Sequence, residues 1–202
     1  MRRQEHWENV YRQKGDAELS WHQEEPGLSL ALIRQFASPA MRIIDVGGGS
    51  SGLAGRLAAG GYDGVTVVDL SAAALERARE RAGPAAERIT WRVADATRAQ
   101  DLGRFDVWHD RAVFHFLTEP ADRQAYLDRA RESIVSGGHL IVATFALDGP
   151  PKCSGLEVQR YDAAGLVAAF GEPFQLVYKT REVHTTPWGK PQAFTYAVLQ
   201  RG

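Results

Sequence analysis

Short runs of β-branched and other apolar residues alternate along this chain with longer runs rich in alanine, leucine and arginine. The short runs have the length of buried strands, and the longer runs have the spacing of helices that cover a sheet. Such alternation is typical of βαβ units around a mostly parallel sheet. The pattern predicts one α/β domain over residues 1–202, with an N-terminal helical segment or lid at 1–40 and a core at 41–202.

Strands and helices can be assigned through most of the core. The predicted parallel strands are Arg42–Val46, Val65–Asp69, Ile89–Val93, Phe105–Trp108 and His139–Phe145. The predicted helices are Ser51–Ala59, Ala72–Arg81, which Ser71 would cap, and Asp122–Val135. Gly137 and Gly138 are expected to turn the chain into the fifth strand.

The last part of the chain has a different pattern. Residues 174–183 and 193–199 are both rich in β-forming residues, and the turn-like residues 186–191 join them without a helix. Two strands joined in this way form an antiparallel hairpin. A hairpin is therefore predicted at the end of the sheet.

The sequence IIDVGGGSSG, from Ile43 to Gly52, takes a buried strand into a glycine-rich turn before a helix. Backbone N–H groups at such a helix start bind anionic or polar ligands. The glycine spacing also satisfies the dinucleotide pattern, so the turn alone fits a nicotinamide cofactor as well as another nucleoside. Asp45 would repel a pyrophosphate and suits a ligand with a cationic amino group, although a strand-end carboxylate can also simply cap the turn.

Two more carboxylates follow the next two strands. Asp69 ends the second strand, where a carboxylate can accept hydrogen bonds from both ribose hydroxyls. Asp95 follows the third strand, where it can accept from an adenine amino group while the backbone N–H of Ala96 meets a ring nitrogen. Acidic residues at three successive strand ends predict a nucleoside site at one edge of the sheet.

Three segments, IIDVGGGSSGLAGRL, VTVVDLSAAALERARER and ITWRVADATR, resemble the nucleoside-binding motifs of class I S-adenosylmethionine-dependent methyltransferases. The resemblance continues through the fourth and fifth strands to the final hairpin. It implies a doubly wound, Rossmann-like sheet of strand order 3-2-1-4-5-7-6 with strand 7 antiparallel. It also implies S-adenosyl-L-methionine as cofactor, S-adenosyl-L-homocysteine as product, and methyl transfer to an N, O or S atom.

The resemblance implies that the segment after the fourth strand meets the methionine end of the cofactor, with Asp110 accepting from its ammonium group. Trp21 is expected to cover the cofactor as part of a lid, while docking of a terminal segment on the core explains it almost equally well. The predicted cofactor-binding residues are Trp21, Asp45, Gly47, Gly48, Gly49, Asp69, Leu70, Asp95, Ala96, His109 and Asp110.

Methyl transfer from a sulfonium is an in-line displacement, so alignment and exclusion of water can suffice without a base. A lysine acceptor, with a usual pKa near ~10.4, would need a proton acceptor such as Asp110 or His115. His115 lies between two phenylalanines, which is typical of a packed histidine. The predicted catalytic residues are Asp110 and His115, and the predicted substrate contacts are Arg111, Tyr161, His184 and Trp188.

Purely structural roles are the alternatives for two of these side chains: Arg111 could form a local ion pair, and Trp188 could pack as a clamp on the hairpin. Cys153 has no partner at zinc-ligand spacing, so neither a metal nor a cysteine nucleophile is expected.

The acceptor is less well specified than the cofactor. A small molecule is favoured, because the chain has little beyond the core fold with which to hold a protein surface. The spacing of Trp7, Tyr11 and Trp21 and the pair Asp110-Arg111 resemble the lysine methyltransferases that act on translation elongation factor, which implies a protein-lysine acceptor as the alternative. A nicotinamide-dependent oxidoreductase and a catalytically silent cofactor-binding module are further alternatives; the chain shows no Tyr-x-x-x-Lys pair for the former.

Composition excludes several other classes. With 44% hydrophobic residues, 24% charged residues and a net charge of -1, the chain is typical of a globular protein and has no basic surplus for nucleic acid. It has one cysteine and no apolar stretch near its start, so neither export nor membrane insertion is expected. We expect a cytoplasmic monomer or weak dimer.

Overall fold

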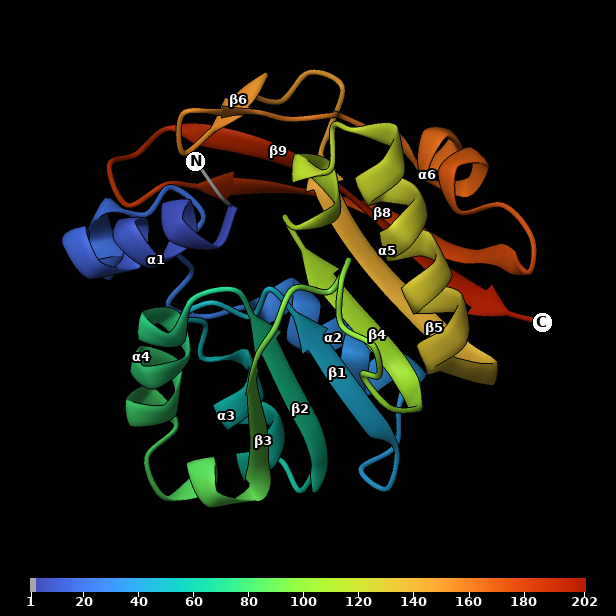
Figure 1. The fold of residues 1–202 in the computed structure, drawn as a ribbon, viewed down its shortest axis with the longest axis horizontal. Helices are drawn as coiled ribbons and strands as arrows, with labels where there is room; N and C mark the ends of the chain where they lie inside the picture. The colour runs from blue at the N-terminus through green and yellow to red at the C-terminus, as the bar shows by residue number, and fades with distance from the viewer. Residues whose placement is uncertain (1–2) are drawn as a thin grey trace.

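A seven-stranded sheet of order β3-β2-β1-β4-β5-β9-β8 forms the centre of the computed structural model, which describes residues 3–202 (Figure 1). Its strands are β1 Arg42–Val46, β2 Gly64–Asp69, β3 Ile89–Val93, β4 Phe105–Arg111, β5 Ile134–Phe145, β8 Phe174–Thr185 and β9 Pro191–Arg201. Strands β1 to β5 pair in parallel, whereas β9 runs antiparallel to both β5 and β8. Because β8 and β9 are the sixth and seventh strands of the sheet, the predicted order and the reversed last strand are confirmed.

Helices cover both faces of this sheet. They are α1 Arg3–Gln13, α2 Gly27–Phe36, α3 Leu53–Ala59, α4 Ala72–Ala82, α5 Pro120–Ser133 and α6 Ala163–Phe170, with 3-10 turns at Asp16–Glu18, Gly83–Arg88 and Phe114–Phe116. Successive side chains of a strand point to opposite faces. Ile43 therefore packs in a core with α2 and α3, and Ile44 packs in a second core with α5 and α6.

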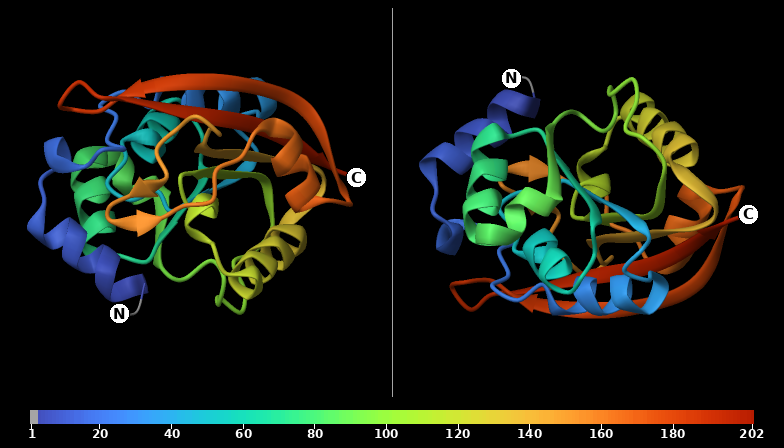
Figure 2. Two further views of the ribbon diagram at one scale, coloured as in Figure 1. Left: turned by 90° about the horizontal axis from the view of Figure 1, so that it is seen from above. Right: turned by 90° about the horizontal axis from the view of Figure 1, so that it is seen from below.

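The N-terminal segment divides into two parts. Helix α2 belongs to the layer that covers the sheet, where Leu32 and Ile33 are buried. Helix α1 lies beside α4 instead (Figures 1 and 2). Of the predicted segment 1–40, residues 1 and 2 lie outside the described residues. Within residues 3–202, no helix combines the length and the hydrophobicity needed to cross a bilayer.

The predicted element boundaries hold for β1 and β3, and Ser71 caps α4 by accepting from the backbone N–H of Ala74. The fifth strand differs from the prediction. It starts at Ile134 and passes through Gly137 and Gly138 without a reversing turn, because the register with β4 shifts there and an irregular stretch absorbs the glycine pair.

Helix α6 and the two-stranded ribbon of β6 Lys152–Cys153 and β7 Leu156–Glu157 were not among the predicted elements. The side chain of Asp162 caps α6 by accepting from the backbone N–H of Gly165. A helix of eight residues is too short to show a clear helical period in its sequence.

Candidate functional site

The carboxyl ends of β1, β2, β3 and β4 meet at one edge of the sheet, where open α/β sheets bind their ligands. A cavity of about 780 Å³, the large cavity, opens there. Among the predicted cofactor residues, Trp21, Gly47, Asp69, Leu70, Asp95 and Ala96 line it. A small cavity of about 530 Å³ shares Tyr11, Trp21, Gly47 and Arg111 with the large one, and Asp45, Gly48 and His109 line it.

The turn after β1 requires its glycines. Gly47 and Gly49 have φ angles of 68° and 55°, which side-chain-bearing residues rarely adopt. A Cβ on Gly47 would lie 1.9 Å from Cγ2 of Val113, and one on Gly49 would lie 2.3 Å from the hydroxyl oxygen of Tyr11. Gly49 does not line either cavity, so its contribution is to the shape of the turn.

Asp69 ties this turn to the end of β2. One carboxylate oxygen accepts from the backbone N–H of Gly49 at 2.9 Å, and the other accepts from Ser71 N–H at 2.8 Å. Burial raises the pKa of Asp69 to about 6, although the backbone donors act in the opposite direction. The carboxylate is therefore both fixed in orientation and sensitive to pH near neutrality.

Asp95 lies partly exposed after β3. It accepts from the backbone N–H of Thr97 at 2.8 Å and from its hydroxyl at 2.7 Å. Arg3 of α1 reaches across to both residues, with Nη2 at 3.3 Å from the Asp95 carboxylate and 2.9 Å from the Thr97 hydroxyl. Helix α1 thus lies against the end of β3 through a charged contact.

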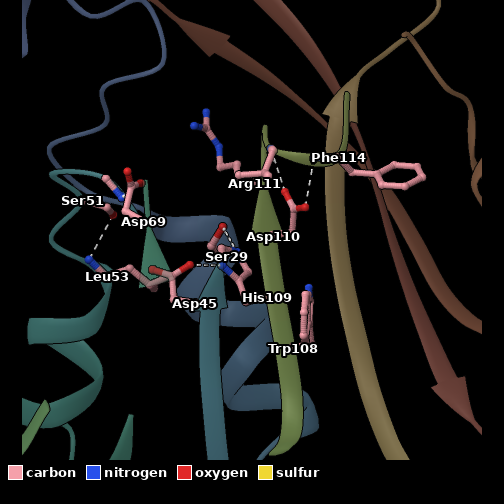
Figure 3. Close-up of polar contacts among 12 residues, drawn as sticks. Ser29, Asp45, Ser51, Leu53, Asp69, Trp108, His109, Asp110, Arg111 and Phe114 are labelled. Atoms are coloured by element: carbon pink, nitrogen blue, oxygen red, sulfur yellow. Dashed lines mark hydrogen bonds and ion pairs between the residues drawn. The ribbon is translucent and has the colours of Figure 1, made fainter. Parts of the chain in front are cut away.

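Asp45 and His109 stand opposite each other on β1 and β4, on the face that α2 covers (Figure 3). The Nδ1 atom of His109 lies 2.7 Å from Asp45 Oδ1, and its Nε2 atom lies 2.9 Å from the hydroxyl of Ser29. A carboxylate can only accept, so Nδ1–H donates to Asp45 and a neutral ring accepts from Ser29. All three residues are buried, and all three line the small cavity.

Asp110 does not lie where it was predicted. Figure 3 shows it turned toward Phe114, whereas Arg111 extends beyond the strand end. Its oxygens accept from the backbone N–H groups of Val113 at 2.8 Å and Phe114 at 3.0 Å and from the hydroxyl of Tyr126. It is fully buried, lines neither cavity, and burial raises its pKa to about 6.

The expectation that Asp110 meets the cofactor ammonium or acts as a proton acceptor stays a prediction, and the observed position of Asp110 outside both cavities does not support it. The sequence held a signal for its direction, because alternation along β4 places Asp110 on the opposite face from His109. His109 lies on the face that carries Asp45, so Asp110 must point toward α5.

His115 also lies outside both cavities. Its Nδ1 atom accepts from the backbone N–H of Phe145 at 3.2 Å, and its ring packs against Phe145 and Phe116. Complete burial lowers its pKa to about 3. The predicted role as a base is not supported, because the ring is packed in the core and stays neutral.

Of the predicted substrate contacts, Arg111 lines both cavities and the others line neither. Tyr161 packs on the ring of Phe114 with centroids 5.4 Å apart, and His184 Nε2–H donates to the carbonyl of Ser20 at 2.8 Å. Trp188 is 50% exposed in the turn between β8 and β9. Its indole therefore lines neither cavity and is not buried as a packing clamp would be.

Several residues that line the large cavity were not among the individually predicted site residues, although the sequence had pointed to the N-terminal aromatic residues and to the segment after β4. From α1 come Arg3, Trp7 and Tyr11, and from the segments after β4 and β5 come Ala112, Val113, Phe116, Leu117 and Cys153. Trp7 packs edge-on against Trp21 and Phe116, with centroids 5.6 and 4.9 Å away. The spacing of Trp7 and Tyr11 is a pattern that the sequence shows. The elements that these two rings contact could not be predicted from it.

Helix α1 is held to the site by polar contacts as well. Glu8 accepts from the hydroxyl of Ser71 at 2.8 Å, directly after β2. The hydroxyl of Ser50 donates to Asp16, just beyond α1, at 2.8 Å. With the Arg3 contacts, the N-terminal segment touches the glycine turn and the ends of β2 and β3.

Within the described part of the chain, no group of three or more His, Cys, Asp or Glu side chains could hold a metal ion. Cys153 is buried, and burial raises its thiol pKa to about 11, so the thiol is protonated at neutral pH.

Comparisons with known proteins agree with this geometry. Residues 43–138 match a family model described as a methyltransferase domain. The chain is 31% identical over 117 residues to a malonyl-[acyl-carrier protein] O-methyltransferase of Anoxybacillus flavithermus, covering 57% of this chain and 43% of that protein. It is 23% identical over 119 residues to an eEF1A lysine and N-terminal methyltransferase of Danio rerio, covering 58% of this chain and 17% of the relative. The chain thus spans less than half the length of these curated relatives.

Among solved structures, the fold matches that of the N-methyltransferase NodS from Bradyrhizobium japonicum in complex with S-adenosyl-L-homocysteine. The TM-score is 0.72 at 15% identity, and the match covers 97% of this chain and 98% of that one.

Proposed function

We infer that this chain, which belongs to the class I S-adenosylmethionine-dependent methyltransferases, transfers the methyl group of S-adenosyl-L-methionine to an N, O or S atom of a small molecule. The observation that carries the inference is the large cavity, whose wall holds the ends of β1, β2 and β3 with Asp69 and Asp95 facing one space.

The residues present fit this cofactor. Asp69 is held by two backbone donors in an orientation that leaves further acceptor capacity for the two ribose hydroxyls. Asp95 and Ala96 stand where an adenine would lie, and Val113 and Leu117 supply apolar contacts for its ring. The turn is built from glycine because a Cβ atom at position 47 or 49 would clash with Val113 or Tyr11.

The small cavity suits the methionine end. Asp45 is an acceptor for an ammonium group, and His109 holds its carboxylate in place with Ser29 behind it. We assign His109 a positioning role, because its two nitrogens are already paired. His22 lines the same space and offers a ring N–H donor to a carboxylate.

When bound, S-adenosyl-L-methionine supplies an electrophilic methyl group on a cationic sulfur. The chain's contribution is to orient the two reactants and exclude water, which Trp7, Tyr11 and Trp21 can do as the wall over the strand ends. No described side chain needs to protonate the departing thioether, because the sulfonium becomes neutral when it loses the methyl group.

The first test is calorimetric titration of the purified chain with S-adenosyl-L-methionine, S-adenosyl-L-homocysteine and NAD. We expect micromolar binding of the first two and none of NAD. Asp69→Asn should weaken binding at least about tenfold, since it removes a hydrogen bond to a charged group. Asp63→Asn, a change of the same size at an exposed carboxylate, is the matched control. Binding of NAD alone would favour an oxidoreductase, and cofactor binding without turnover on any acceptor would favour a silent binding module.

A protein-lysine acceptor is the second candidate, favoured by the similarity to the eEF1A lysine and N-terminal methyltransferase. It requires a lysine side chain to reach the large cavity past α1. Incubation with a lysine-containing protein substrate and radiolabelled cofactor distinguishes the two: label in protein supports this candidate, and label in small acceptors supports the first.

A further inference from the structure

We divide the residues that line the large cavity into two halves according to the segments that contribute them. The strand-end half carries Asp69, Leu70, Asp95 and Ala96, which the proposed function assigns to the nucleoside. The other half, here called the acceptor half, is lined by Trp7, Tyr11, Trp21, Arg111, Ala112, Phe116 and Cys153. Its surface is aromatic and apolar apart from one guanidinium.

Arg111 stands where the acceptor half meets the small cavity, because it lines both cavities. Its Nη1 donates to the carbonyl of Trp21 at 3.0 Å, and its Nε donates to the hydroxyl of Tyr196 at 3.2 Å. The guanidinium also lies 4.4 Å over the ring of Phe194. These contacts fix the plane of the group with only 11% of the side chain exposed.

One nitrogen of this guanidinium has no hydrogen-bond partner. Arg111 Nη2 is buried without a hydrogen bond, and its ionic contact among the described residues is a long ion pair with Glu182 at 3.7 Å. Glu182 is engaged elsewhere, since its oxygens accept from Gln23 at 3.0 Å and from Tyr196 at 3.2 Å. A buried N–H without a hydrogen bond is costly unless a strong acceptor binds it, and the long ion pair with Glu182 does not supply that hydrogen bond.

The acceptor half, as the structure describes it within residues 3–202, contains no side chain suited to take a proton. Asp69 and Asp95 are the only carboxylates lining the large cavity, and both belong to the nucleoside half. Asp110 and His115 face the core. Burial raises the pKa of both Tyr11 and Cys153, so both keep their protons at neutral pH. An acceptor that must lose a proton to the protein, such as an amine or an alcohol, finds no base.

We propose that the acceptor is a small, flat, apolar molecule that attacks through an atom already anionic at neutral pH, a thiolate sulfur or a carboxylate oxygen, with Arg111 Nη2 as its hydrogen-bond donor. The aromatic walls hold its body. This deepens the proposed function and rests on it. The anionic atom donates an electron pair to the methyl carbon, the carbon–sulfur bond of the sulfonium breaks, and that pair stays on the departing sulfur. The products are a thioether or methyl ester and a neutral thioether, and no proton is transferred.

The experiment compares four acceptors of similar size with the whole chain and labelled S-adenosyl-L-methionine: thiophenol, benzoate, benzyl alcohol and benzylamine. We expect methylation of thiophenol or benzoate, which separates sulfur from oxygen attack, and none of the other two. The rate with thiophenol should follow its ionised fraction as pH rises and then level off. Methylation of benzylamine or benzyl alcohol would overturn the proposal while leaving the methyltransferase function intact.

Binding provides a readout that does not depend on turnover. In the complex with S-adenosyl-L-homocysteine, calorimetry at pH 8 should detect thiophenolate or benzoate and not benzylamine. Binding of neither anion would refute the proposal. If neither S-adenosyl-L-methionine nor S-adenosyl-L-homocysteine binds, the proposed function itself fails, so the two failures are distinguishable.

Arg111 variants test the assigned donor. Arg111→Met should raise the KM of the anionic acceptor about tenfold or more, as expected for a lost hydrogen bond between charged groups, while the Kd of S-adenosyl-L-homocysteine changes little. Arg111→Lys keeps the charge and should recover part of the loss, and it serves if the Met variant does not fold. Arg181→Met, at an exposed arginine paired with Asp148, is the matched control. Loss of cofactor affinity with an unchanged acceptor KM would instead assign Arg111 to the cofactor carboxylate and overturn the proposal.

Discussion

Replacing Asp110 by asparagine tests whether this carboxylate holds the turn after β4 or serves the reaction. The carboxylate takes hydrogen bonds from three donors, on Val113, Phe114 and Tyr126. Asparagine keeps one accepting oxygen and turns an N–H₂ group toward at least one of these donors. We therefore expect the fold to lose stability and the cavity to stay largely intact.

The magnitude follows from the contacts. Loss of a hydrogen bond to a charged group costs about 1.5–3 kcal/mol. Measured instead as the penalty for the buried donor left without a partner, the cost is about 1–3 kcal/mol. Burial of the charge is itself unfavourable, as the pKa of about 6 for Asp110 indicates, and asparagine avoids that cost. The free energy of unfolding should therefore fall by about 1–3 kcal/mol, which a domain of ordinary stability survives.

Urea unfolding at pH 8 measures this loss, with Tyr126→Phe and the double variant completing a thermodynamic cycle. Because the two side chains share a hydrogen bond, the double variant should lose less stability than the two single variants lose together. The Kd of S-adenosyl-L-homocysteine should change by no more than a few-fold. Unchanged stability together with a collapse of cofactor affinity would refute this reasoning and return Asp110 to the cofactor site.

Three further changes probe the site. Burial raises the pKa of Asp69 to about 6, and only the ionised carboxylate accepts from both ribose hydroxyls. Cofactor affinity measured by calorimetry should therefore fall about tenfold between pH 8 and pH 5. In Asp69→Asn this dependence on pH should disappear. Gly49→Ala should cost about 1–3 kcal/mol in urea unfolding because of its φ of 55° and the clash with Tyr11, whereas Gly52→Ala, with 3.4 Å to its nearest neighbour, should cost less. Trp188→Ala should leave cofactor and acceptor KM unchanged in rate assays, and a higher acceptor KM would restore its predicted substrate role.

The sheet and the approach of the strand-end carboxylates to one edge were predictable because both follow from short patterns. Strand ends are marked by apolar runs that stop at Asp45, Asp69 and Asp95, and parallel pairing brings those ends to one edge. The final hairpin was predictable because the turn-like residues 186–191 separate its two β-rich segments. Such features depend on neighbours in sequence and on the rule that connects parallel strands.

The attachment of α1 and the positions of the distant polar side chains were not predictable in the same way. Arg3 meets Asp95 across 92 positions of sequence, and Glu8 meets Ser71 across 63. Tyr161, His184 and Trp188 have chemically suitable side chains, but their directions are set by packing against distant elements. Asp110 is the exception, because strand alternation alone indicated its direction.

The attachment of α1 has a consequence for how the domain fluctuates. Tyr11 is the only residue of this helix that is buried, and the rest of its attachment is polar contacts and a few edge-on rings. Segments with little buried apolar surface open at a lower free energy than the core strands. Amide hydrogens of α1 should therefore exchange with solvent long before those of β1 and β4, so one wall of the large cavity can detach while the sheet beneath it keeps its hydrogen bonds.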